Sequence, residues 1–195
     1  MAPPPNSARR RAIADGAIEV LARAGVHGFS HRAVDEAAGL PAGTTSNYFR
    51  SRDVLLGAAA ERVLELHRAD MTAAHETVAG PIDRGGLVDL IAMSLEFSAT
   101  MHRARYLAVY ELTLEATRRP ELQRTLDHMQ TEAVDFTLAQ HRALGLRTSR
   151  ADVATLITLF AGALYTLVTG QAGQATGPAA RALAQGMVTG IASPN

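Results

Sequence analysis

The stretch SHRAVDEAAGLPAGTTSNYFRSR, residues 30–52, predicts two short helices joined by a tight turn. Ser30 is a good helix N-cap, and apolar residues follow it at helical spacing. Gly39 is expected to end the first helix, because the residue after a helix often needs a positive φ, which glycine adopts freely. Pro41 prevents that helix from continuing. The second helix is expected over about residues 42–49.

The second helix of this stretch is too short and too polar to bury itself. Polar side chains on a short helix, supported by a packed partner helix and flanked by arginines, suit insertion into the major groove of DNA. The alternative is an ordinary αα-corner with a solvated second helix. The geometry of a helix-turn-helix favours DNA binding.

Residues 9–56 resemble the N-terminal signature of the tetracycline repressor (TetR) family of bacterial transcription factors. The matching residues are a first helix that ends at Gly25, and then Phe29-Ser30, Ala38-Gly39-Leu40, Gly43-Thr44, Tyr48-Phe49, Ser51-Arg52 and Val54-Leu55-Leu56. The rest of the chain resembles the family in length, helical character and the order of its helices.

Three positions depart from the family pattern. An aromatic residue that often touches DNA is usual at Ser46, and lysine is usual at Arg52. A small residue is usual at Asp35, where the two helices cross. Asp35 must therefore either find a hydrogen-bond donor or tilt towards solvent.

The candidate DNA contacts lie in and around this motif. They are Arg9, Arg10, Arg11, Arg32, Gly43, Thr44, Thr45, Ser46, Asn47, Tyr48 and Arg52. Residues 43–47 are expected to face bases, with Asn47 able to pair with adenine. Phosphate contacts are expected for Tyr48, Arg52 and the Arg9–Arg11 run. Arg32 could contact either a base or a phosphate. The alternative for the run is a solvated charge cluster.

The charge distribution agrees with this placement. Residues 1–52 hold seven arginines against four acids, a balance of +3, whereas the rest of the chain has a balance of −3. The sequence contains no cysteine, which removes disulfides and thiol chemistry. With no metal-binding motif either, we expect no metal and no cofactor.

The sequence predicts an all-α fold of about nine helices. Seven helices besides the motif are expected, over about residues 9–25, 51–78, 87–101, 103–117, 120–144, 149–171 and 178–192. We expect a DNA-binding domain over 1–52, with 1–7 as a disordered tail, and a helical bundle for ligand binding and dimerisation over 53–195. Residues 1–7 carry no apolar run typical of a signal peptide, and the apolar stretch Val153–Val168 falls short of a membrane span. A soluble, cytoplasmic protein is expected.

The resemblance implies that the bundle encloses an apolar pocket for a small organic molecule. Tyr106 and Tyr110 are four residues apart on one helix face, and Glu111 lies beside that face. The candidate ligand contacts are Met93, Phe97, Met101, Tyr106, Tyr110, Glu111, His128 and Phe160. The alternative is that these are plain core residues, with Glu111 in surface ion pairs.

The helix over 149–171 is apolar nearly all round, which implies burial on more than one side. We expect the last two helices of two chains to form a four-helix dimer interface. The candidate interface residues are Phe160, Leu164, Leu167, Leu183, Met187 and Ile191.

These features predict a homodimeric repressor that a small organic ligand releases from a palindromic operator. One alternative is a DNA-binding regulator or architectural protein without a ligand. A second is an all-α enzyme, but the sequence has no GxSxG, Walker or Rossmann motif, so no enzymatic activity is expected.

Overall fold

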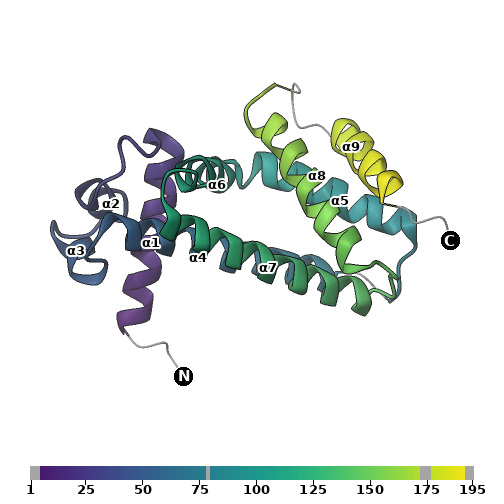
Figure 1. Cartoon of the computed structure of the whole chain (residues 1–195), viewed down its shortest axis with the longest axis horizontal. Helices are drawn as coiled ribbons and strands as arrows, with labels where there is room; N and C mark the ends of the chain where they lie inside the picture. The colour runs from purple at the N-terminus through teal and green to yellow at the C-terminus, as the bar shows by residue number, and fades with distance from the viewer. Residues whose placement is uncertain (1–4, 78–79, 172–176, 192–195) are drawn as a thin grey trace. The chain divides into compact units, whose positions relative to one another are not determined.

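The computed structural model describes residues 5–77, 80–171 and 177–191 (Figure 1). Regular structure in these residues is entirely helical, with no strand among them. The helices are α1 (Pro5–Ala24), α2 (His31–Ala37), α3 (Thr44–Tyr48), α4 (Arg52–Glu76), α5 (Arg84–Thr100), α6 (Arg103–Ala116), α7 (Pro120–Ala143), α8 (Arg150–Val168) and α9 (Gly177–Gly190). The expected all-α fold is confirmed.

The turn between α2 and α3 forms as its sequence predicts. The Ser30 hydroxyl accepts a hydrogen bond from the Ala33 N–H at 3.2 Å and caps α2. Gly39 has a φ of 63°, and the next N–H, that of Leu40, donates to the Asp35 carbonyl at 2.8 Å. This six-residue closure is the usual way to end a helix at a left-handed glycine.

Two expectations about helix ends need correction. The helix α1 begins at Pro5, so residues 5–7 are helical rather than a disordered tail, while residues 1–4 lie outside the described part. Proline suits the first turn of a helix because its missing N–H has no intrahelical partner there. Arg9–Arg11 consequently lie in the second turn. The helix α3 spans Thr44–Tyr48 and is shorter than expected.

The chain divides into two compact units. The first comprises residues up to His67 together with Ala104–Met129, and the second comprises Arg68–Arg103 and the residues from Gln130 onwards. These units do not coincide with segments 1–52 and 53–195, because α4, α6 and α7 each supply residues to both units. The functional division at residue 52 stays a prediction.

Each unit has its own apolar core. In the first unit, side chains of α1, α2 and α4 pack with Phe49 and with Leu112 of α6 and Leu122 of α7. In the second unit, α5 packs against α9, with Leu87, Val88 and Ala92 on one side and Ala184 and Val188 on the other. Figure 1 shows α5, α8 and α9 together in this unit.

The helix α8 leaves much of its apolar surface uncovered within the chain. Of the described helices, it alone, with 19 residues, is long and apolar enough to cross a membrane by length and composition. The stretch Val153–Val168, which was expected to fall short of a span, reaches this length only together with the three residues from Arg150 to Asp152. Only 28% of the most apolar 18-residue segment of α8 is buried inside the chain. Length and composition alone do not separate a membrane helix from one that packs against another protein surface.

Candidate nucleic-acid interface

The exposed side of α3 carries the residues best placed to read bases. Ser46 and Asn47 are exposed, and Thr44 and Tyr48 are half-buried. The Ser46 hydroxyl donates to the Gly43 carbonyl at 2.9 Å, so its oxygen is left to accept a hydrogen bond. Asn47 offers both a donor and an acceptor, the combination that pairs with adenine in the major groove.

Thr45 does not belong to this exposed side. Its side chain is completely buried, although the sequence analysis placed it against bases. The five-residue helix can expose only one side, and Thr45 lies on the side that packs against the rest of the motif. Its expected base contact is therefore corrected to a packing role.

Asp35 finds hydrogen-bond donors at the start of α3. One carboxylate oxygen accepts from the Gly43 N–H and the other from the Thr45 N–H, both at 2.7 Å. Burial of this side chain would raise its pKa, but the neighbouring Thr45 hydroxyl, the two N–H groups and the charge of His31 together lower the pKa below its usual value. The carboxylate is thus ionised and, from α2, accepts two N–H groups at the start of α3, whose N-cap residue is Gly43.

The arginines expected at phosphates do not form one group. Arg9 and Arg32 are exposed, and Arg11 is half-buried. The Arg10 guanidinium lies over the Phe49 ring, 4.4 Å from its centroid, and donates to the Tyr48 carbonyl at 3.3 Å. Arg10 is thereby oriented beside the end of α3 while remaining exposed.

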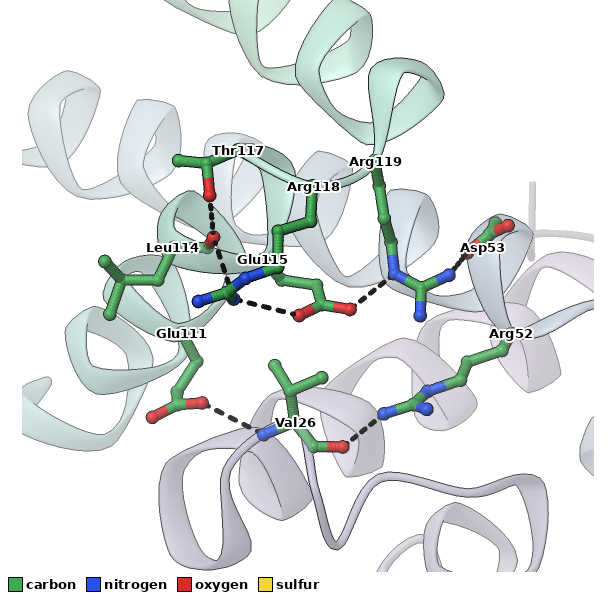
Figure 2. Close-up of polar contacts among 9 residues, drawn as sticks. All are labelled: Val26, Arg52, Asp53, Glu111, Leu114, Glu115, Thr117, Arg118 and Arg119. Atoms are coloured by element: carbon green, nitrogen blue, oxygen red, sulfur yellow. Dashed lines mark hydrogen bonds and ion pairs between the residues drawn. The ribbon is translucent and has the colours of Figure 1, made fainter.

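Arg52 points into the protein. Its guanidinium donates to the Val26 carbonyl, and its Nε is buried without a hydrogen-bond partner (Figure 2). The expected contact with phosphate is therefore corrected: in this structure Arg52 ties the first residue of α4 to the loop between α1 and α2.

Glu111 binds the same peptide segment from the other side. Its carboxylate accepts the Val26 N–H at 2.9 Å, as Figure 2 shows. Gly25 allows this approach, because a Cβ there would lie 3.0 Å from the carboxylate and the φ of Gly25 is 61°. Glu111 was expected to bind ligand, but its carboxylate instead holds the end of α1. Sequence reasoning missed this pairing because a backbone N–H leaves no signature in the sequence.

The polar contacts of Figure 2 continue along α6. The Glu115 carboxylate forms ion pairs with Arg118 and Arg119. Arg119 also forms an ion pair with Asp53, in the first turn of α4, at 2.6 Å. Hydrogen bonding to Arg119 outweighs burial and lowers the pKa of Glu115. Glu115, rather than the neighbouring Glu111, therefore makes the ion pairs of this helix.

The candidate ligand residues fall into two groups. Met93 and Phe97 of α5 and Met101, the residue just after it, follow one another at four-residue intervals and are 48%, 48% and 70% exposed. Tyr106 is buried, and its hydroxyl lies 2.9 Å from His67 Nδ1. The remaining candidates are half-buried Tyr110 and Phe160 and exposed His128. That the whole set lines one pocket stays a prediction.

The candidate interface residues are also divided by the structure. Leu164, Leu167 and Met187 are buried within their own chain, so they are corrected from surface contacts to core residues. Phe160, Leu183 and Ile191 are half-buried. The exposed side of α8 carries other residues instead: Thr155, Thr158, Leu159, Gly162 and Tyr165.

Two family models match this chain. Residues 13–59 match "Bacterial regulatory proteins, tetR family", and residues 83–192 match "Tetracyclin repressor-like, C-terminal domain". The chain belongs to the TetR family. It is a DNA-binding transcriptional regulator, and members of this family are generally DNA-binding proteins rather than enzymes.

Solved TetR-like structures cover nearly the whole chain. The multidrug binding protein EbrR in complex with imidazole is 28% identical, with a TM-score of 0.69 over 96% of this chain and 97% of EbrR. Its ethidium complex is 27% identical, with a TM-score of 0.69 over 92% of this chain and 98% of EbrR. A TetR-family member from Streptomyces coelicolor is 27% identical, with a TM-score of 0.70 over 92% and 97%. No curated protein sequence matches the chain.

Proposed function

We propose that this TetR-family protein is a cytoplasmic, homodimeric repressor that a small organic ligand releases from a palindromic operator. One observation carries the DNA-binding part: α3 is capped on its packed side by Asp35 and exposes Ser46 and Asn47 on the other. A short helix held in this way presents polar side chains at a fixed angle to the major groove.

The proposed DNA contacts are those that remain exposed or half-buried. Thr44, Ser46 and Asn47 face bases. Gly43 is exposed, its φ of 87° suits glycine, and a Cβ there would meet nothing within 4 Å, so its backbone is open to approach by DNA. The proposed phosphate contacts are Arg9, Arg10, Arg11, Arg32 and Tyr48.

The exposed side of α8 supports the dimer. Leu159 and Tyr165 are 42% and 40% exposed there, and Gly162 lies between them. Glycine inside a helix costs about 1 kcal/mol relative to alanine, and nothing within 4 Å of a Cβ at Gly162 explains its presence. A second helix that packs closely against this surface would explain it. Gly186 on α9 is exposed and open in the same way.

A two-fold dimer also follows from the size of α3. One short recognition helix covers too few base pairs for useful affinity, so such motifs work in pairs about one helical turn of DNA apart, ~34–36 Å. A palindromic operator would match that symmetry. We therefore propose an interface built from α8 and α9 of two chains.

Met93 and Phe97 on α5, and Met101 at its end, support the proposal of a ligand. Thioether and phenyl groups form an adaptable apolar surface that suits flat aromatic molecules. EbrR, which is 26–28% identical to this chain, binds ethidium and imidazole. We propose a planar aromatic cation as the ligand class.

The first test measures DNA binding in the absence of any ligand. The protein is used to select duplexes from a randomised library, and the selected sequence is examined for two-fold symmetry. Gel shift with the selected duplex, together with light scattering of the free protein, then gives the stoichiometry. A selected site without two-fold symmetry, or a site bound by a single chain, overturns the proposal of a dimeric repressor.

Ligand binding is measured on the protein without DNA, because ethidium also intercalates into duplexes. Ethidium is excited with visible light, which protein side chains do not absorb, so its fluorescence and anisotropy report binding without protein background. Phe97→Ala is expected to weaken ethidium binding and ethidium-dependent release, with little change in affinity for the selected duplex. Equal release of parent and variant would show that ethidium acts through the DNA.

A further inference from the structure

We propose that Asp35 and His31, both on α2, are positioning residues that hold α3 by its two ends and so set the accuracy of base reading. This inference rests on the proposed use of α3 as the base-reading helix. It goes beyond it by assigning sequence discrimination to two side chains that do not touch DNA.

The first contact holds the start of α3. Asp35 is 3% exposed, and its two carboxylate oxygens each accept one N–H, from Gly43 and from Thr45, at 2.7 Å. The first N–H groups of any helix lack intrahelical acceptors. A single buried carboxylate therefore satisfies two of these groups at once.

The second contact holds the end of α3. His31 Nε2 lies 2.7 Å from the carbonyl oxygen of Phe49, which follows the last residue of α3. A carbonyl oxygen only accepts, so Nε2 carries the hydrogen in this contact. The neutral ring with hydrogen on Nε2 and the protonated ring both satisfy that requirement.

The two contacts come from one side of α2. His31 and Asp35 are four residues apart, which places their side chains one above the other on the helix. The helix α3 lies against them and has only five residues. Isolated helices of this length are not stable in water, so the orientation of α3 depends on these contacts and on the burial of Thr45 and Phe49.

This arrangement separates two kinds of DNA binding. Non-specific affinity comes mostly from arginine–phosphate contacts, which tolerate small changes in the angle of α3. Specific affinity needs donors and acceptors of α3 in register with base edges. Loss of either end contact should therefore reduce affinity for the selected site more than affinity for unrelated DNA.

The variants are chosen to remove one contact at a time. Asp35→Asn keeps the size of the side chain but turns one acceptor into a donor, facing an N–H group. His31→Leu removes the donor to Phe49, whereas His31→Gln keeps a donor at similar reach. Glu36→Gln is the matched control, because Glu36 is the exposed acid next to Asp35 and its loss changes the charge alone.

The probes are the duplex selected by the parent protein and a scrambled duplex of the same length, at one salt concentration. Asp35→Asn and His31→Leu should each weaken binding of the selected duplex about five- to thirtyfold, the equivalent of losing one cap. Binding of the scrambled duplex should change less than about twofold for both. His31→Gln and Glu36→Gln should keep the parent's ratio between the two duplexes. An unchanged ratio in Asp35→Asn or His31→Leu overturns the proposal.

A second measurement does not depend on DNA. In the parent protein, the Gly43 and Thr45 amide hydrogens should exchange slowly with solvent, and this protection should fall in Asp35→Asn. Fast exchange of both amides in the parent overturns the proposal, even if a variant fails to fold. If the parent selects no sequence, the base-reading function fails, and amide exchange still decides whether Asp35 holds α3.

Discussion

Arg119 donates to Asp53 at 2.6 Å and thereby joins the residues after α6 to the first turn of α4 (Figure 2). A second link runs from Glu111 of α6 to the Val26 N–H at 2.9 Å. The Arg119 and Asp53 side chains are 32% and 49% exposed, whereas the Glu111 contact is partly buried. Exposed ion pairs contribute little, so the Glu111 link is expected to be the stronger of the two.

Glu111→Ala should lower the free energy of unfolding by about 1–3 kcal/mol, because it leaves the Val26 N–H without an acceptor. Arg119→Ala should cost less than about 1 kcal/mol. Glu111→Gln keeps a side-chain oxygen and should recover most of the loss. Urea denaturation measures all three, and equal losses for Glu111→Ala and Arg119→Ala would contradict this ranking.

Arg52→Ala is expected to act on stability rather than on DNA contacts. It leaves the Val26 carbonyl without its donor, so the free energy of unfolding should fall by about 1–3 kcal/mol. The slope of log affinity against log salt should stay at the parent's value. Exposed Arg32 provides the comparison: if it contacts a phosphate, Arg32→Ala should reduce that slope by about 0.9 with little loss of stability. A reduced slope in Arg52→Ala would restore Arg52 as a phosphate contact.

Thr45 and Asn47 should respond in opposite ways. Thr45→Val removes a fully buried hydroxyl that helps to lower the pKa of Asp35 but keeps the Thr45 N–H that Asp35 accepts, so stability should fall by about 1 kcal/mol while DNA binding stays unchanged. Asn47→Ala should leave stability unchanged and lose about 1–3 kcal/mol of discrimination between the selected duplex and single-base variants. Competition binding with a set of such variants measures this. Relaxed specificity in Thr45→Val would place its side chain at the bases after all.

The proposed dimer surface predicts a contrast between two leucines of α8. Leu159→Arg changes an exposed residue and should give a folded monomer at micromolar concentration. Leu164→Arg buries a charge in the core of the chain and should instead unfold the protein. Light scattering and circular dichroism distinguish these results.

Two glycines provide the matched control for the same surface. Gly162→Ala should weaken the dimer, whereas Gly57→Ala on α4, where a Cβ also meets nothing within 4 Å, should not. A dimeric Leu159→Arg variant would exclude this side of α8 from the interface.

His141 should contribute a pH dependence to stability. Burial lowers the pKa of its ring below the ordinary 6.5, so the folded protein favours the neutral form. Unfolding then takes up a proton, and stability is lost as the pH falls below 6.5 until the pH reaches the folded-state pKa. His141→Leu should remove this part of the pH dependence, while His128→Gln, at an exposed position, should keep it. Denaturation midpoints between pH 8 and pH 5, followed as differences from the parent, test this. A slope in His141→Leu that equals the parent's would contradict it.

Local chemistry made the helix ends of the motif predictable. Ser30 and Gly39 act through hydrogen bonds within a few residues, and the structure places both as expected. Asp35 was recognisable as a residue that needs a donor, because a carboxylate had replaced a small residue at a helix crossing. The sequence pattern did not decide whether the Asp35 side chain binds a protein donor or turns towards solvent, because that depends on where α3 packs.

Side-chain direction was less predictable where packing between distant segments decides it. Five residues of α3 give too little periodicity to show that Thr45 faces inward. Arg52 and Glu111 both bind backbone atoms of Val26, which lies 26 and 85 positions away in the chain. Leu164 and Leu159 are equally apolar in the sequence, and only the packing of α8 separates the buried one from the exposed one.

The two hydrogen bonds at Val26 have a consequence for genetics. Both involve atoms of the peptide backbone, which every residue except proline supplies in the same form. Exchange of Val26 for another apolar residue should therefore leave both bonds in place, and proline alone would remove the N–H. Mutants selected for reduced stability should accordingly fall at codons 52 and 111, while codon 26 tolerates conservative change.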